Sequence, residues 1–443
     1  MNKIKFIFAF TLFLSMALVS CKQEYDGVFN QNATERSEAY LSDLKEILVS
    51  APEGWVMDYY LGTNRSNGCY AFLMKFTDTK VTACSELHTD ELESYYRLTF
   101  DAGAVLSFDT YNTVLHLLAT PSAEAYQGKM ADFEFLVINA SKDEILLKGK
   151  RSENYIRMRP LQQDAPTYLS ELIKLKEEMI VGFGDGSING EEVKAELDLD
   201  KQMITLYSPT EAFKSFTTSF AFTTTGFRLY EPFVMKDMSM TDFTYTHETE
   251  TLTSTASNGA ELKMACSKPA YWRPFDSFVG KYDLTMKYKD EKNEEVYETI
   301  ENVELTIDES GDAYLLKGAS NAFDIKFGYS RSRGSLTLFK QDIATVENVL
   351  LRLCILDNKG YSLSWAEEPG MYLTVDVNSN DQEYLFTTNN YEDFISGGVL
   401  IWVFQDGDAY NGNDVRSWLQ GHKEWLFVNG QYVLDGLYKL TRK

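Results

Sequence analysis

Hydrophobic positions recur at helical spacing in two short stretches of the chain, and short apolar runs typical of strands fill most of the remainder. The first helical stretch is Thr34–Ser50 and the second is Pro166–Ile180. We predict an amphipathic helix over each range. Thr34 is expected to be the N-cap of the first helix, and Pro52 and Gly54 are expected to end it.

Between and after the two helices, short runs rich in aromatic and β-branched residues are bounded by Gly, Asn, Asp or Ser. These runs extend from Trp55 to Met158 and again from Val193 to Ala265. Short turns between neighbouring runs favour antiparallel pairing, so each helix is expected to precede an antiparallel meander. A helix followed by a meander, twice, is most simply explained by a duplication, although two unrelated meanders would give a similar pattern.

Beyond a predicted linker, Ala270–Pro274, further strand runs continue to the last residue with little helical pattern. Turn sequences such as Asn429-Gly430 indicate hairpins, and this part is expected to be a β-sandwich or a small barrel. The whole chain is predicted to be mainly β, and α+β in its N-terminal part. The predicted domains are listed in chain order: signal peptide 1–20, tether 21–31, helix-plus-meander units 32–163 and 164–269, and a C-terminal β-domain 275–443.

The first residues have the order of a secretory signal. Lys3 and Lys5 precede an apolar run, Phe6–Val19, which is followed by Ser20 and Cys21. A cysteine at the cleavage position predicts lipoprotein processing, with a lipid on the Cys21 thiol that holds the chain at a membrane. Acidic residues just after it, Glu24 and Asp26, resemble a signal for the outer cell surface. No later apolar run approaches the ~20 residues of a membrane helix.

The chain is strongly acidic, with 66 Asp and Glu against 42 Lys and Arg and a formal net charge of −24. This balance argues against a nucleic-acid partner, because such binding depends on a basic face. We interpret the acidity as a means of solubility, and attraction of cationic ligands is the alternative. A hydrophobic fraction of 44% excludes disorder by composition.

The cysteines other than Cys21 indicate structural roles. Cys69 and Cys84 could form a disulfide after export, but the expected hairpin register does not place them opposite each other. Cys266 and Cys354 lie in apolar runs and are expected to be buried free thiols. Neither a Cys-x-x-C pair nor a Cys/His cluster is present, so we expect no metal and no cofactor.

Several segments resemble a known family: Tyr95, Leu106–Asn112 with His116, Phe133–Phe135, Leu147–Lys150 and Ser219–Tyr230. They are similar to the Bacteroides-type lipoproteins of domain-of-unknown-function family 4302, over roughly Cys21–Met264. The segment Val279–Leu284 resembles the start of β-modules appended to many lipoproteins of the same bacteria. The resemblance implies outer-membrane placement beside a TonB-dependent nutrient transporter and a starch-utilisation-type lipoprotein. It implies no activity and transfers no catalytic residue.

Two groups of residues are candidates for ligand contact. Asp109, Asn112 and His116 could line a polar pocket, whereas the structural alternative is a turn whose side chains bond to local backbone. Trp365, Trp418 and Trp425 lie near polar residues and could stack on sugar rings, whereas core packing is the alternative.

The sequence contains little that indicates catalysis. The segment Gly184–Gly190 contains Ser187 but is expected to be a turn-rich loop, and the motif Gly-x-Ser-x-Gly is missing. Glu86, Glu91 and Glu93 are expected in a solvated acidic loop. We therefore predict a non-catalytic binding or accessory component of a nutrient-uptake system. The alternatives are a hydrolase with a carboxylate pair and an architectural or adhesion protein.

Overall fold

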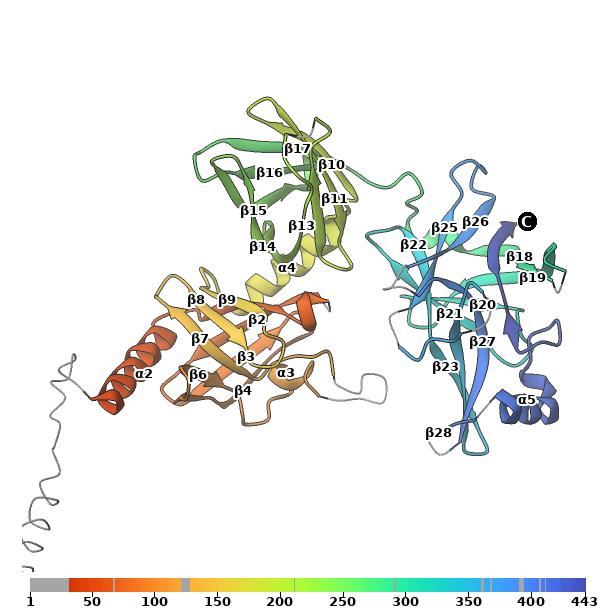
Figure 1. The fold of residues 1–443 in the computed structure, drawn as a ribbon, viewed down its shortest axis with the longest axis horizontal. Coiled ribbons are helices and arrows are strands. Elements are labelled where there is room, and N and C mark those ends of the chain that lie inside the picture. Colours follow the sequence, from red (N-terminus) through yellow and green to blue (C-terminus); the bar gives the residue numbers. More distant parts are fainter. Residues whose placement is uncertain are drawn as a thin grey trace, which may run out of the picture.

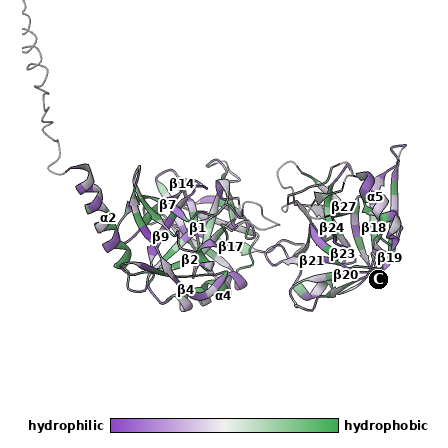
Figure 2. Ribbon diagram, turned by 90° about the horizontal axis from the view of Figure 1, so that it is seen from below, coloured by the Kyte–Doolittle hydropathy of each residue, from purple (hydrophilic) through white to green (hydrophobic). Residues whose placement is uncertain are grey.

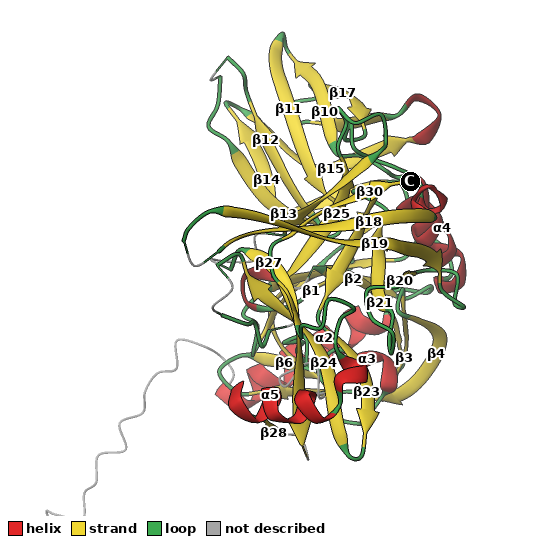
Figure 3. Ribbon diagram, turned by 90° about the vertical axis from the view of Figure 1, so that its right-hand side faces the viewer, coloured by secondary structure: helices red, strands yellow, loops and turns green. Residues whose placement is uncertain are grey.

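The computed structural model describes residues 32–66, 68–120, 128–210, 212–290, 292–359, 362–366, 369–389, 394–405, 408–410 and 412–443. The predicted signal, Cys21, Glu24 and Asp26 lie outside these residues. Figure 3 shows that strands dominate the described chain and that few helices accompany them. The fold is mainly β, as the sequence predicts, and three units follow one another along the chain (Figure 1).

The first unit is a helix followed by a nine-stranded antiparallel meander whose first strand pairs with its last. The spatial order is β4-β3-β2-β1-β9-β8-β7-β6-β5, and Trp55 of β1 lies opposite Pro160 of β9. The sheet is therefore open, with β4 and β5 as its two edge strands. Its elements are α2 Ala33–Val49, β1 Trp55–Tyr60, β2 Cys69–Phe76, β3 Lys80–Ser85, β4 His88–Tyr95, β5 Arg97–Phe100, β6 Ala104–Ser107, α3 Thr113–His116, β7 Glu134–Ala140, β8 Ile145–Gly149 and β9 Tyr155–Pro160.

Helix α2 begins one residue earlier than predicted, and its N-cap is Asn32, not Thr34. The Asn32 side chain accepts a hydrogen bond from the Glu35 N–H, and the Glu35 carboxylate accepts one from the Asn32 N–H. This reciprocal arrangement satisfies two backbone donors at the helix start. Near the end of the helix Leu48 is buried, and the indole Nε1 of Trp55 donates to the Leu48 carbonyl at 2.8 Å. Figure 2 shows that α2 carries both hydrophilic and hydrophobic residues along its length.

The second unit is helix α4 followed by a closed eight-stranded barrel, β10–β17, in which β10 pairs with β17. Asp164 caps α4 by accepting from the Thr167 N–H. The elements are α4 Ala165–Glu178, β10 Phe183–Ile188, β11 Glu191–Asp198, β12 Met203–Tyr207, β13 Phe216–Thr223, β14 Gly226–Met235, β15 Met238–Thr246, β16 Thr251–Thr255 and β17 Glu261–Ser267.

The glycine-rich segment predicted as a loop is mostly strand β10, so that prediction is wrong. A Cβ at Gly186 would lie 2.2 Å from the carbonyl oxygen of Lys263 on β17. Gly186 therefore serves the close approach of two barrel strands, whereas Gly190, with a φ of 81°, lies in the turn after β10.

The first two units share one hydrophobic core. Leu169 and Leu172 of α4 are buried together with Val56 and Leu73, which face outward from the first sheet, and with the interior of the barrel. Helix α4 accordingly lies between the sheet and the barrel (Figure 1). Both units have the same order, a helix and then a meander joined first strand to last, while the duplication itself stays a prediction.

The third unit is also a closed barrel, with a second sheet beside it. The barrel order is β18-β19-β20-β21-β22-β25-β26-β30, and the second sheet runs β23-β24-β27-β28 with β29 on β27. The elements are β18 Gly280–Lys289, β19 Glu295–Ile307, β20 Tyr314–Lys317, β21 Ile325–Ser330, β22 Ser335–Phe339, β23 Gln341–Val346, β24 Val349–Asp357, β25 Gly370–Val375, β26 Glu383–Thr388, β27 Ser396–Gln405, β28 Asp408–Ala409, α5 Gly412–Gly421, β29 Val433–Leu434 and β30 Leu437–Arg442.

The predicted linker and the β21–β22 turn connect the second and third units. Trp272 donates its indole N–H to the Arg331 carbonyl at 2.8 Å, so the linker packs on the third unit. From that turn, Arg333 forms an ion pair of 2.7 Å with Asp198 of β11. The Arg331 guanidinium also donates to the carbonyl of Glu177 at the end of α4.

Candidate ligand-binding site

The predicted pocket residues Asp109 and Asn112 lie at the open edge of the first sheet. Asn112 is buried and caps α3, since its side-chain oxygen accepts from the Val114 N–H at 2.9 Å. Its amide nitrogen donates to the Leu92 carbonyl of β4 at 3.2 Å and to the Ser94 hydroxyl at 3.1 Å. Asp109 forms an exposed ion pair with Arg97 of β5. Asn112 thus bonds to β4 and Asp109 pairs with β5, on the two sides of the gap between these strands.

His116 lies between two exposed aromatic rings. Its ring is stacked on Tyr111 at 5.4 Å between centroids and on Phe133 at 5.7 Å. Its Nδ1 atom lies 3.0 Å from the Asn112 carbonyl oxygen. The structure brings His116 and Asn112 together, and their contacts are the local ones of a capped turn.

The three candidate tryptophans do not form one site. Trp365 is 55% exposed and meets Trp402 edge-on at 5.8 Å between centroids. Trp418 and Trp425 are half-buried against the core of the third unit, and Trp418 stacks on His422 at 4.0 Å.

The prediction of a solvated acidic loop for Glu86, Glu91 and Glu93 is wrong about the loop and about Glu86, while Glu91 and Glu93 are exposed as expected. Glu91 and Glu93 lie on strand β4. The side chain of Glu86 is only 7% exposed, pairs with Lys176 of α4 and accepts from the Ala71 N–H at 2.8 Å.

A polar cleft of about 480 Å³ opens where the first two units meet. We name it the seam cleft. It is lined by Thr63, Asn64, Arg65, Arg151, Ser152, Glu153, Asn154, Tyr155, Tyr230 and Glu231. The volume falls within the range usual for small-ligand sites. Strands β1 and β9 pair antiparallel, so the loop after β1 and the turn before β9 lie at the same end and form its walls.

The turn that carries Arg151 is built around the buried carboxylate of Asp132. Oδ1 of Asp132 accepts from the N–H groups of Arg151 at 2.5 Å and Ser152 at 3.2 Å. A Cβ at Gly149 would lie 2.2 Å from the other carboxylate oxygen, so only glycine fits there. A buried carboxylate is costly unless it is hydrogen-bonded. The Asp132 carboxylate therefore holds the turn in the shape that directs these N–H groups towards it.

The loop that carries Arg65 is held from the same side by Asn154. The buried amide nitrogen of Asn154 donates to the Gly62 carbonyl at 2.7 Å and to the Tyr60 carbonyl at 3.3 Å. Both Asn64 and Arg65 have positive φ, at 54° and 64°. Left-handed backbone at non-glycine residues is costly and persists where surrounding contacts impose it.

The barrel contributes Tyr230 and Glu231 of β14 to this cleft, and Tyr230 makes the contacts with its walls. The Arg65 guanidinium lies 4.2 Å from the centroid of its ring, and its hydroxyl accepts from the Tyr155 N–H at 2.9 Å. Its ring also meets Tyr60 edge-on at 4.8 Å. One side chain thus joins both walls of the cleft to the second unit.

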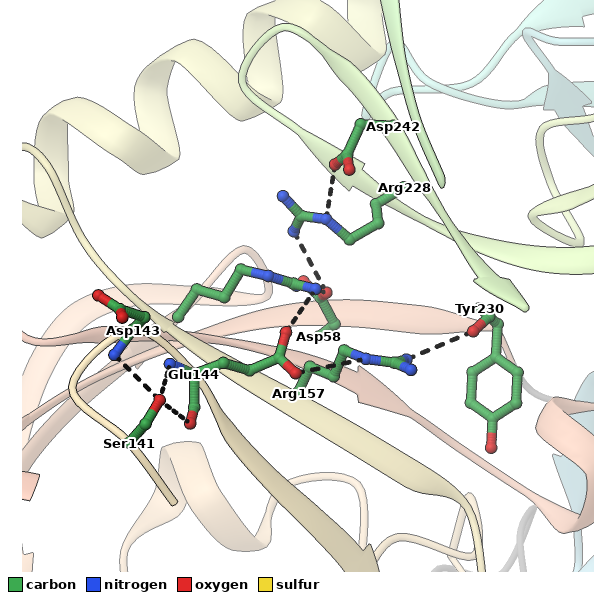
Figure 4. A network of polar contacts seen from close by, with 9 residues as sticks. Asp58, Ser141, Asp143, Glu144, Arg157, Arg228, Tyr230 and Asp242 are labelled. Carbon is green, nitrogen blue, oxygen red and sulfur yellow. Dashed lines mark hydrogen bonds and ion pairs between the residues drawn. The ribbon is translucent and has the colours of Figure 1, made fainter. Parts of the chain in front are cut away.

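A network of ion pairs fixes the seam next to the cleft (Figure 4). The Asp58 carboxylate pairs with Arg159 at 3.0 Å and with Arg228 of the barrel at 3.5 Å. Arg228 also pairs with Asp242 at 2.7 Å, and the Arg157 guanidinium donates to the Tyr230 carbonyl at 3.3 Å. The network favours one fixed arrangement of the two units around the cleft.

Sequence reasoning missed every residue of the seam cleft. A usable signal was present, because Gly62–Arg65 and Gly149–Ser152 are both polar turns that carry an arginine beside a predicted strand. Only the pairing of the first strand with the last brings the two turns together, and the meander prediction left that pairing open.

A second cleft of about 270 Å³ lies in the third unit and holds two carboxylates, Glu298 and Asp435. Burial raises the pKa of Asp435 above its usual value. The Glu298 carboxylate accepts from the Asn429 amide at 2.9 Å. Among the residues that the structure describes, no cluster of three or more His, Cys, Asp or Glu side chains could hold a metal ion.

These features define a class: a multi-unit β-protein in which helix-plus-meander units enclose a polar cleft. A family model with the description Domain of unknown function (DUF4302) matches residues 25–247, and the chain belongs to this family. The match includes every residue that lines the seam cleft. A second model, DUF4987, also described as a domain of unknown function, matches residues 255–402.

Other comparisons add little. No match is found among curated proteins. The β chain of DNA polymerase III from Streptococcus pneumoniae is 9% identical over 78% of this chain and 95% of that chain, with a TM-score of 0.11. A mutant of Transferrin Binding Protein B from Haemophilus parasuis is 9% identical over 85% and 67%, also with a TM-score of 0.11. These likenesses carry no argument. No helix within the described ranges is long and apolar enough to cross a membrane.

Proposed function

We propose that this protein is a lipid-anchored binding protein of the bacterial outer membrane that holds a ligand in the seam cleft. The observation that carries the proposal is the cleft itself, whose two walls are fixed by the buried side chains of Asp132 and Asn154. Fixed walls lower the ordering cost of binding, because little conformational freedom remains to be lost. The protein would serve as an accessory of a nutrient-uptake system, beside a TonB-dependent transporter and a starch-utilisation-type lipoprotein.

The lipid anchor rests on the sequence of residues 1–21, with its lysines, apolar run and terminal cysteine. The test is metabolic labelling of the producing bacterium with a palmitate analogue. Wild-type protein should be labelled, and Cys21→Ser should not. Protease treatment of whole cells should then degrade the labelled protein if it faces outward. Label that persists in Cys21→Ser would contradict the anchor.

Binding in the seam cleft is tested by filling it. Thr63 is exposed and lines the cleft, so Thr63→Trp should block the cleft without disturbing the core. Lys142→Trp places the same side chain in an exposed turn that lines none of the described clefts and is the matched control. The wild-type protein and the control are screened on glycan and peptide arrays and in a pull-down from outer-membrane extracts.

The proposal expects a ligand that wild type and Lys142→Trp bind alike and that Thr63→Trp binds at least about tenfold more weakly, a difference of about 1.4 kcal/mol. Empty arrays together with an empty pull-down, obtained with folded protein, would contradict it. A ligand that Thr63→Trp binds normally would place the site elsewhere and would also contradict it.

A second candidate function is hydrolysis in the cleft of the third unit. The observation that favours it is that Asp435, whose pKa burial raises, lines the same cleft as Glu298, because two carboxyl groups across a cleft, one with a raised pKa, suit glycoside hydrolysis. Release of reducing sugar from a panel of polysaccharides tests it. Wild type should be active, and both Asp435→Asn and Glu298→Gln should lose activity. A wild type that is inactive on the whole panel would contradict this candidate.

A further inference from the structure

Within the described residues, the two guanidinium groups of the seam cleft, Arg65 and Arg151, have no carboxylate partner. On the strands of the first two units, Arg97, Arg159 and Arg228 each pair with an Asp. Arg65 donates its Nε to the Ser219 hydroxyl at 3.3 Å but makes no ion pair in the described part of the chain, and the exposed Arg151 side chain makes none either. Glu153 and Glu231 line the same cleft, yet neither forms an ion pair with these arginines within the described residues, and Glu153 pairs with Lys148 instead. Because acidic residues outnumber basic ones 66 to 42, two arginines without an ion pair in one cleft require an explanation.

The remaining lining of the cleft has both donors and acceptors of hydrogen bonds. Thr63 and Ser152 carry hydroxyls, while Glu153 and Glu231 carry carboxylates that only accept while ionised. Tyr155 adds a ring that is 44% exposed. Saccharide hydroxyls both donate and accept, and sugar rings pack on aromatic faces, so this lining suits a sugar that also carries a negative charge.

We infer that the ligand of the seam cleft is an acidic saccharide whose carboxylate is bound by Arg65 and Arg151. The inference rests on the proposed function of the cleft and names its ligand class. Planar guanidinium groups match a carboxylate in geometry and bind it by charge-assisted hydrogen bonds. The hydroxyl groups of the sugar donate to Glu153 and Glu231.

Two other anionic ligands fit less well. Inorganic phosphate has few hydroxyl donors to offer Glu153 and Glu231, which line the same cleft, whereas a saccharide carries its charge on a carboxylate and its hydroxyl donors elsewhere. An acidic peptide would need a free strand edge or apolar pockets for its side chains. The cleft is walled by loops and lined mostly by polar groups. The net charge of −24 also repels any polyanion at long range, so short-range contacts in the cleft must supply the affinity.

The experiment is calorimetric titration of the purified protein with tetragalacturonate and with the same oligomer after methyl esterification of its carboxyl groups. Arg151→Gln removes one cation whose side chain has no partner to lose. Lys142→Gln removes one positive charge from an exposed turn of the same unit and is the matched control. Polyglutamate and inorganic phosphate are titrated as competing anions.

The inference expects binding of the acidic oligomer, a loss of about ten- to a hundred-fold in Arg151→Gln, and no change in Lys142→Gln. Binding of the methyl ester as strong as that of the acid would overturn the acidic ligand class. It would leave the proposed function intact if Thr63→Trp still abolishes binding. Stronger binding of polyglutamate or phosphate, or no binding of the uronate at all, would also overturn the inference.

Discussion

The guanidinium of Arg65 lies 4.2 Å from the ring centroid of Tyr230, so a loop of the first sheet and a strand of the barrel meet at one contact. The same tyrosine accepts a hydrogen bond from the Tyr155 N–H. These two interactions of Tyr230 connect the cleft walls to the second unit. Arg65 contacts the ring and Tyr155 contacts the hydroxyl, so substitutions can remove one interaction without the other.

Tyr230→Phe keeps the ring and removes the hydroxyl. The Tyr155 N–H then loses its acceptor, and we expect a loss of about 1–2 kcal/mol in unfolding free energy. Tyr230→Ala also removes the ring and should cost about 3–5 kcal/mol. Urea unfolding followed by tryptophan fluorescence measures both. Tyr438→Phe is the control, because Tyr438 is exposed and its hydroxyl makes no hydrogen bond with any described residue. Equal stability of Tyr230→Phe and wild type would contradict the role of the hydroxyl.

The ion-pair network at the seam predicts that loss of Asp58 destabilises the protein more than loss of Asp242. Asp58 is 7% exposed and pairs with two arginines, whereas Asp242 is 63% exposed and pairs with one of them. Asp58→Ala leaves two half-buried guanidinium groups without their shared partner and should cost about 3 kcal/mol. Asp242→Ala should cost less than about 1 kcal/mol. The measurement is the thermal unfolding midpoint of each variant, and equal shifts would show that the Asp58 pairs add nothing beyond a surface pair.

The two long helices could be predicted from sequence because their signals are local. Amphipathic spacing and capping residues lie within the helices, and α4 spans Ala165–Glu178 where Pro166–Ile180 is predicted. Strand β4 was missed because its conformation depends on pairing with another strand and not on a local signal. Its sequence, His88–Tyr95, is mostly polar, and it is a strand because it pairs with β3 at the edge of the sheet. Helix α5 was missed although Val415, Trp418 and Leu419 recur at helical spacing, because it has only 10 residues and glycine stands at both of its ends.

The candidate site shows the same limit. The segment Asp109–His116 was singled out because its polar side chains could line a pocket, and the structure supports the structural alternative, since Asn112 caps α3 and bonds to β4. The seam cleft was missed because Arg65 and Arg151 are far apart in the chain. Only the pairing of β1 with β9 brings them together, and long-range pairing is not encoded in local periodicity.

Substitution of Asn112 distinguishes a structural from a ligand-binding role. Asn112→Ala removes the cap of α3 and the bonds to the Leu92 carbonyl and the Ser94 hydroxyl, so it should cost about 1–3 kcal/mol. Asp109→Asn breaks only an exposed ion pair and should cost less than about 1 kcal/mol. Chemical denaturation measures both changes. An Asn112→Ala variant with unchanged stability and impaired ligand binding would reverse the assignment.

The thiols that pack in or against the cores predict how stability depends on pH. Cys84 and Cys354 are buried, whereas Cys266, which was expected to be buried, is only partly so. Burial raises the pKa of Cys84 to about 11 and the pKa values of Cys266 and Cys354 to about 12, whereas an unfolded thiol has a pKa of about 8.5. Between these limits the unfolded chain has released protons that the folded chain retains. The unfolding free energy should therefore be fully present below about pH 8 and fall as the pH rises towards 11.

Thermal midpoints at pH 7.5, 9 and 10.5 measure this dependence, and they should decrease in that order. Buried tyrosines add to the decrease, since burial also raises the pKa of Tyr96 and Tyr245 to about 12. Cys84→Ala isolates one thiol and should make the decrease shallower than in wild type. An exposed tyrosine change, Tyr438→Phe, should leave the slope unchanged. Rapid modification of Cys84 by a thiol reagent in folded protein at pH 7.5 would contradict the raised pKa, because a thiol that titrates near 11 has almost no thiolate at that pH.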